Sequence, residues 1–229
     1  MSKFEIFWNQ FTLGGYKNFL EGLKNTALIA LFGLLIGFLL GCIIATVKLI
    51  PKQHPVVDFF KALCNIYIMV FRGTPMVVQL LLMHFALFPL IGFNIDSVAE
   101  AMLIFGMNSA AYMSEMLRSG INAVDKGQME AGRSLGFGFT ATMTRIILPQ
   151  AIKNILPTLG NEFIALIKET SIVSFIAVMD LTMSFQSIAN STYEYFVPYI
   201  LLAVVYLVLV MIITWLIRLL ERRLSKNER

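Results

Sequence analysis

Charged side chains are scarce in this sequence: they make up 14% of 229 residues, while 58% of the residues are hydrophobic. A soluble domain usually carries about a quarter charged residues. The mean hydropathy of +0.76 points in the same direction. The composition therefore excludes an ordinary soluble domain and predicts an integral membrane protein whose surface faces the lipid bilayer.

Residues that commonly carry chemistry are also scarce. The two histidines, His54 and His84, lie on different segments, and both cysteines lie inside apolar runs, so no metal site is expected. No G-x-x-x-x-G-K-[ST] motif occurs, which excludes a P-loop nucleotide site in this chain. No serine has the context of a nucleophile elbow. We therefore expect no catalytic residue and no cofactor of its own in this chain.

Long apolar runs are abundant instead. A hydrocarbon core of about 30 Å needs roughly 20 apolar residues per helix. Upstream of the first such run, aromatic residues within about 4–22 predict an interfacial helix. The sequence thus predicts an all-α integral membrane fold, with residues 1–229 forming one transmembrane domain. The five predicted membrane helices span residues of about 26–49, 58–90 (interrupted), 97–118, 150–178 (interrupted) and 196–219.

The basic residues predict how these helices are oriented. The loops after the first and third spans and the C-terminal tail carry Lys and Arg, whereas the loops after the second and fourth spans carry none. By the positive-inside rule, the N-terminus lies outside and the C-terminus lies in the cytoplasm. Because the net charge of +4 is gathered at these flanking positions, no nucleic-acid partner is expected. The segment of about 119–149 is the longest cytoplasmic loop.

This loop carries the signals of a short helix. Asp125 followed by Gln128 resembles a capping box, and Glu130 in the first turn suits the helix dipole. Gly136 offers a stop, which predicts a helix of about ten residues. Such a helix is too short to be stable alone, so we expect it to pack on something. The apolar Phe137 then either anchors the loop in a groove of a partner or rests on the membrane surface.

The same loop resembles the E-A-A, G, I-x-L-P signature of the permease subunits of ABC importers. Glu130-Ala131-Gly132 is followed after three residues by Gly136 and after nine more by Ile146-Ile147-Leu148-Pro149. The one departure is Gly132, at a position that is usually alanine. "FRGTP" at 71–75 and "LGNEFIALIKETSIVS" at 159–174 further resemble the polar amino acid uptake branch of that family.

The resemblance implies the type I importer fold in a prokaryotic inner (plasma) membrane. It implies that the loop helix is a coupling helix, seated on a separate ATP-binding cassette subunit that holds the ATP and Mg. The other implied partners are a second permease copy, identical or paralogous, an extracytoplasmic solute-binding protein and an amino acid substrate. The residues expected to contact the ATP-binding subunit are Glu130, Ala131, Gly132, Leu135, Gly136, Phe137 and Gly138.

Polar residues inside the predicted spans indicate a substrate path, because such residues are costly in lipid and tend to face the bundle interior. Counting along the spans places Arg72, Asn108 and Glu162 near the midplane, where transporters tend to bind their substrates. Tyr112 and Glu115 follow Asn108 at i+4 and i+7 and extend one polar helix face. The candidate substrate-binding residues are Arg72, Met76, Asn108, Ser109, Tyr112, Met113, Glu115, Asn161 and Glu162.

Two of the spans are predicted to be broken helices. Pro75 follows Arg72, and Pro157 with Gly160 precedes Glu162. A break frees backbone groups that protein, water or ligand must satisfy. A zwitterionic amino acid offers a carboxylate to Arg72 and an ammonium to Glu162. Alternatively, Arg72 and Glu162 pair with each other or with neighbouring residues and lock the bundle.

The sequence favours the membrane subunit of an ATP-driven importer of polar L-amino acids, the basic ones included. Because five helices are few for a complete path, we expect two permease copies around a two-fold axis. The alternative is an ion-coupled secondary amino acid transporter in which Glu115 and Glu162 carry protons. An odd number of spans without an evident inverted repeat fits that alternative less well. The sequence leaves the particular amino acid open.

Overall fold

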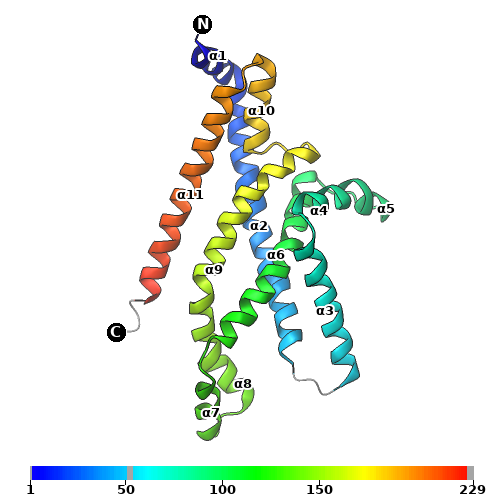
Figure 1. The fold of residues 1–229 in the computed structure, drawn as a ribbon, viewed down its shortest axis with the longest axis vertical. Helices are drawn as coiled ribbons and strands as arrows, with labels where there is room; N and C mark the ends of the chain where they lie inside the picture. The colour runs from blue at the N-terminus through cyan, green and yellow to red at the C-terminus, as the bar shows by residue number, and fades with distance from the viewer. Residues whose placement is uncertain (1, 51–53, 226–229) are drawn as a thin grey trace.

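The computed structural model describes residues 2–50 and 54–225, and in those ranges most residues lie in helices. Figure 1 shows an elongated molecule with α1 and α10 at one end, α7 and α8 at the other, and α4 and α5 projecting sideways. The helices are α1 (Lys3–Gln10), α2 (Tyr16–Leu49), α3 (Pro55–Gly73), α4 (Met76–Leu82), α5 (Phe88–Leu90), α6 (Ser97–Asn122), α7 (Lys126–Ser134), α8 (Phe139–Thr142), α9 (Leu148–Glu169), α10 (Leu181–Thr192) and α11 (Phe196–Ser225).

The long helices differ in how apolar they are. Two continuous helical stretches of the described residues, Lys3–Leu49 and Phe196–Arg223, are long and apolar enough to cross a membrane alone. The bent pair Pro55–Gly73 and Met76–Leu90 meets the same criterion jointly. The more polar α6 and α9 pack against each other and against α2. The polar helices α6 and α9 thus lie within the bundle, as expected for a membrane protein because polar groups are costly in lipid.

Close packing of α2 on α6 depends on three glycines spaced four residues apart. A Cβ added at Gly37 would lie 2.7 Å from Ser109 Cβ, and one at Gly41 would lie 2.6 Å from Met113 Cβ. At Gly33 the nearest atom would be Phe105 Cβ at 3.1 Å. Small residues at this spacing let two membrane helices approach closely. The repeat Gly33, Gly37 and Gly41 is visible in the sequence and is a signal for this contact.

The predicted interruption of the second span is confirmed and is sharper than a kink. The axes of Pro55–Gly73 and Met76–Leu90 differ by 108° across Thr74 and Pro75. Thr74 has extended backbone angles, as expected for a residue that precedes proline. The arm of α4 and α5 therefore turns away from α3 (Figure 1).

The predicted break at Pro157 and Gly160 is wrong, because α9 is continuous from Leu148 to Glu169. A proline inside a helix removes one backbone hydrogen bond, but the turns on both sides of Pro157 remain helical. Gly160 has a packing role instead: a Cβ there would lie 2.7 Å from Ile217 Cγ2 on α11. The segment is interrupted only after α9 ends, where Thr170–Ile176 forms a tighter 3-10 helix.

The predicted interfacial helix is also shorter than expected. The helix α1 ends at Gln10, and a widened turn at Phe11–Gly15 with a kink at Gly14 leads into α2. Residues 16–22 therefore belong to the first long helix. Farther along α2, Gly22 allows a close approach, since a Cβ there would lie 2.4 Å from the carbonyl oxygen of Asp180. The close contact holds this part of α2 within the bundle.

Candidate substrate path and coupling surface

The break between α3 and α4 is held by two amide side chains. Gln79 Nε2 donates to the carbonyl oxygens of Phe71 at 2.9 Å and Thr74 at 3.0 Å, and to Thr74 Oγ1 at 2.7 Å. Asn108 Nδ2 donates to Gln79 Oε1 at 2.8 Å and to the Phe71 carbonyl at 3.3 Å. Both amides are buried. The carbonyls freed by the break are thus satisfied by the protein itself, and Asn108 ties α6 to the end of α3.

At the next residue of α6, Ser109, the helix meets Glu162 of α9. Ser109 Oγ, which is fully buried, donates to Glu162 Oε1 at 2.9 Å. Within the described residues, Glu162 Oε2 has neither a hydrogen-bond nor an ion-pair partner. Asn161 is exposed beside it. A half-buried carboxylate with one oxygen fixed and the other free can accept a cationic group.

Arg72 approaches the same face from the end of α3. Its guanidinium carbon lies 5.3 Å from the centre of the Tyr112 ring, a cation–π contact. Among the described residues, no ion pair within 4 Å joins Arg72 to Glu162. The direct pairing of these two groups, one of the sequence alternatives, is therefore not formed in this structure. Substrate binding by either residue stays a prediction.

An open cavity of about 450 Å³, the exit cavity, lies between α3, α6 and α9. It includes two of the candidate residues from the polar face of α6, together with Arg72. The lining residues are Arg72, Tyr112, Glu115, Met116, Arg118, Ser119, Gly120, Ala123, Asn154, Ile155 and Thr158. The polar face of α6 was predictable from the sequence, whereas Arg118 and Asn154 were not predicted as members of this wall.

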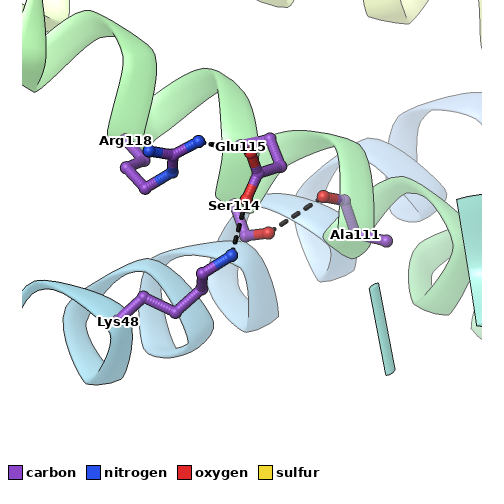
Figure 2. Close-up of polar contacts among 5 residues, drawn as sticks. All are labelled: Lys48, Ala111, Ser114, Glu115 and Arg118. Atoms are coloured by element: carbon purple, nitrogen blue, oxygen red, sulfur yellow. Dashed lines mark hydrogen bonds and ion pairs between the residues drawn. The ribbon is translucent and has the colours of Figure 1, made fainter. Parts of the chain in front are cut away.

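Glu115 is engaged by two cations, as Figure 2 shows. Lys48 Nζ on α2 lies 2.7 Å from Glu115 Oε1, and Arg118 Nη2 on α6 lies 2.8 Å from Glu115 Oε2. Ser114 Oγ, also drawn, donates to the Ala111 carbonyl at 2.9 Å and takes no part in the ion pairs. Glu115 therefore joins α2 to α6 and has both carboxylate oxygens occupied.

The two candidate methionines lie in packed surroundings. Met113 is fully buried against Gly41 of α2 and does not line the exit cavity. The structure therefore moves Met113 from the expected pocket wall to the contact between α2 and α6. Met76 is partly buried and packs on the main hydrophobic core at the start of α4. Neither side chain contacts the exit cavity.

The short helix predicted in the long loop is present as α7, and its coupling role stays a prediction. Asp125 Oδ1 accepts the Gly127 amide at 2.6 Å and caps its start. At its end, Gly136 adopts a left-handed conformation with φ of +86°, which glycine accommodates without strain. The Phe137 amide donates to the Gly132 carbonyl at 3.1 Å across this turn. The helix is nine residues long, close to the expected ten.

The surface around α7 combines a tight inner contact with exposed apolar side chains. Gly132 is buried, and a Cβ there would lie 2.5 Å from Thr142 Cγ2. Thr142 is fully buried and its Oγ1 donates to the Gly138 carbonyl at 3.1 Å. Leu135, by contrast, is 78% exposed. The remaining exposed residues of the predicted coupling set are Glu130, Ala131, Gly136, Phe137 and Gly138.

Comparison with known proteins identifies relatives of most of the chain. Residues 33–226 match the family described as binding-protein-dependent transport system inner membrane component. The arginine transport system permease protein ArtQ of Bacillus subtilis is 41% identical over 209 residues, which cover 91% of this chain and 93% of that protein. The putative glutamine transport system permease protein GlnP of Rickettsia bellii is 42% identical over 202 residues, 88% of each chain.

A solved structure with the same fold is also similar in sequence. It is a chain from a crystal structure of an amino acid ABC transporter with histidines. The TM-score is 0.83 at 42% sequence identity, and the match covers 93% of this chain and 96% of that chain. The arrangement of α1 to α11 is therefore one that an experimentally determined transporter subunit also adopts.

Proposed function

Since this chain belongs to the family of binding-protein-dependent transport system inner membrane components, and so is a multi-pass permease subunit of an ATP-driven amino acid importer, we propose that it carries polar L-amino acids, the basic ones included, past Glu162. The type I importer fold expected from the sequence is confirmed by the structural match. Relatives named as arginine and glutamine permeases support the polar substrate class.

The observation that carries the proposal is the half-satisfied carboxylate of Glu162. Ser109 holds one oxygen at 2.9 Å, so the carboxylate is oriented while its second oxygen remains available to an ammonium or guanidinium group. Arg72, stacked on Tyr112 nearby, is the candidate partner for the substrate's α-carboxylate. Asn108 and Gln79 act indirectly: their hydrogen bonds hold the end of α3 that carries Arg72.

We further propose that ATP and Mg are bound by a separate ATP-binding subunit that docks on α7. The exposed apolar Leu135 and Phe137 beside a rigid short helix are suited to a groove on such a partner. The end of the molecule that carries α7 then faces the cytoplasm, in agreement with the loop charges, and the N-terminus lies outside. A second permease copy and an extracytoplasmic solute-binding protein complete the transporter. Family membership gives no support to the ion-coupled alternative.

The test is uptake of radiolabelled L-arginine and L-glutamine into proteoliposomes that contain the complete transporter and internal ATP. We expect Glu162→Gln to lower uptake by about tenfold or more, because a charge-assisted contact contributes roughly 1.5–3 kcal/mol. The matched control is Glu21→Gln, which removes an exposed carboxylate on α2 and should leave uptake unchanged. Equal uptake by Glu162→Gln and wild type would refute the assignment of Glu162.

A further inference from the structure

The exit cavity lies on the side of Glu162 that faces the coupling loop. On α6, Glu115 and Arg118 line it six and nine residues beyond Ser109, about 9 and 14 Å nearer to α7. On α9, Thr158 and Asn154 line it four and eight residues before Glu162. The cavity therefore begins close to the contact between Ser109 and Glu162 and extends toward the coupling loop. A solute that leaves Glu162 in that direction enters it.

The charges on its wall favour an anion. The one carboxylate, Glu115, is already compensated by Lys48 at 2.7 Å and Arg118 at 2.8 Å, so it is not placed to accept a cation (Figure 2). Arg72 is exposed, and within the described residues it forms no ion pair. Two guanidinium groups thus face one compensated carboxylate. The wall carries an excess of positive charge.

Arg118 has hydrogen-bonding capacity that the structure does not use. A guanidinium offers five N–H groups, and the structure engages Nη2 alone, with Glu115. Arg118 Nε is the one buried side-chain nitrogen or oxygen of the described residues that lacks a partner. The side chain is 42% exposed, so the rest of its guanidinium can be reached. The exposed part of the guanidinium is therefore the part that a ligand can contact.

We propose that the exit cavity is a second binding site for the imported solute, in which Arg118 holds the solute's carboxylate with Arg72 at the opposite wall. The proposal rests on the proposed function, which supplies an amino acid to this cavity. The planar guanidinium fork matches a carboxylate in geometry and charge. Glu115 is a positioning residue: it holds Arg118, and because Lys48 neutralises it, it does not repel the incoming carboxylate. Asn154 and Thr158 offer further polar groups from α9.

The test uses a carboxylate that lacks the ammonium group read by Glu162. N-acetylglycine is the probe, and N-acetylglycinamide is its uncharged counterpart. Binding to the complete transporter in nanodiscs of zwitterionic lipid is measured by saturation-transfer NMR. We expect the carboxylate to bind wild type and Glu162→Gln alike, and to bind Arg118→Gln about tenfold more weakly or worse. The amide should not bind.

Two further variants are controls that distinguish loss of the binding site from misfolding. Arg118→Lys keeps a cation beside Glu115 but loses the planar fork, and should bind the probe with intermediate affinity. Arg222→Gln, at an exposed position of α11, should bind it as wild type does. Both variants should retain the ATP-binding subunit on size-exclusion chromatography, as should Arg118→Gln.

Several results would overturn the proposal. They are no binding of N-acetylglycine to wild type, equal binding of its amide, or unchanged binding to Arg118→Gln. Displacement of the probe when anionic lipid is added to the nanodiscs would assign the cavity to a lipid phosphate instead. Failure of the proposed function is seen separately, since L-arginine uptake would then survive Glu162→Gln whatever the probe does.

Discussion

The solute region, around Glu162 and the α3–α4 break, and the coupling region, around α7, achieve specificity in different ways. In the solute region, buried polar groups satisfy one another through Gln79, Asn108 and Ser109, and one carboxylate oxygen is left over. In the coupling region, the inner contact between Gly132 and Thr142 depends on the absence of a side chain at Gly132, and Leu135 and Phe137 on the outer surface are apolar. Under the proposed function, recognition within the membrane depends on unfilled hydrogen-bonding capacity, whereas coupling depends on the fit of small residues.

The largest effect on the solute region is expected from Gln79→Leu. The change leaves the Thr74 carbonyl without the hydrogen bond from Gln79, and it leaves the buried Asn108 amide with the Phe71 carbonyl at 3.3 Å in place of Gln79 Oε1 at 2.8 Å. Because each buried polar group left unsatisfied costs about 1–3 kcal/mol, we expect the free energy of unfolding to fall by about 2 kcal/mol or more. Denaturant unfolding of the purified chain measures it. Gln186→Leu, at an exposed position of α10, is the control, and an equal effect of the two changes would refute the role of the network.

The coupling region should respond to volume and not to hydrogen bonding. Gly132→Ala places a methyl group 2.5 Å from Thr142 Cγ2, and overpacking of this kind costs about 1–3 kcal/mol. We expect the variant to lose both uptake and co-elution with the ATP-binding subunit. Adding Thr142→Ser removes Cγ2 but keeps the hydroxyl that donates to the Gly138 carbonyl. The double variant should therefore regain both uptake and co-elution with the ATP-binding subunit.

Alanine is the usual residue at position 132 in the family signature, so the same experiment shows whether glycine at this position affects assembly and uptake. Normal assembly and uptake by Gly132→Ala alone would show that the loop relaxes around the methyl group. The coupling region would then not depend on the fit of small residues, and its contrast with the polar solute region would no longer hold.

The smallest effect is expected from Pro157→Ala. This proline is exposed and lies in a continuous helix, so its replacement restores a backbone hydrogen bond and removes no contact with the candidate site. Uptake of L-arginine should be unchanged, and the free energy of unfolding should be unchanged or slightly higher. A clear loss of uptake would mean that flexibility at Pro157 contributes to transport, and that the solute region extends beyond Glu162 and the α3–α4 break.

The two prolines also show how far sequence reasoning reaches. Pro75 and Pro157 gave the same signal, but only Pro75 marks a break, because Gln79 and Asn108 are in place to satisfy the freed carbonyls there. That arrangement depends on contacts between segments distant in sequence, which a local pattern does not contain. The coupling helix was predictable within one residue of its length, since its capping signals at Asp125 and Gly136 are local.

The candidate site was predictable only in part for the same reason. Helix periodicity placed Tyr112 and Glu115 on one face of α6, and both line the exit cavity. The partner of Glu115 on α2, Lys48, lies 67 positions away in the chain, and no periodic pattern connects them. The orientation of Met113 toward α2 follows from Gly41, whose role becomes visible only when the two helices are packed together.

The most direct test of the division between the two regions measures L-arginine uptake and retention of the ATP-binding subunit in one Glu162→Gln preparation. Because the two regions are separate in this account, uptake should fall by about tenfold or more. The ATP-binding subunit should still co-elute as it does with wild type. Uptake at the wild-type level would contradict the role of Glu162. Loss of the ATP-binding subunit would contradict the separation of the solute region from the coupling region.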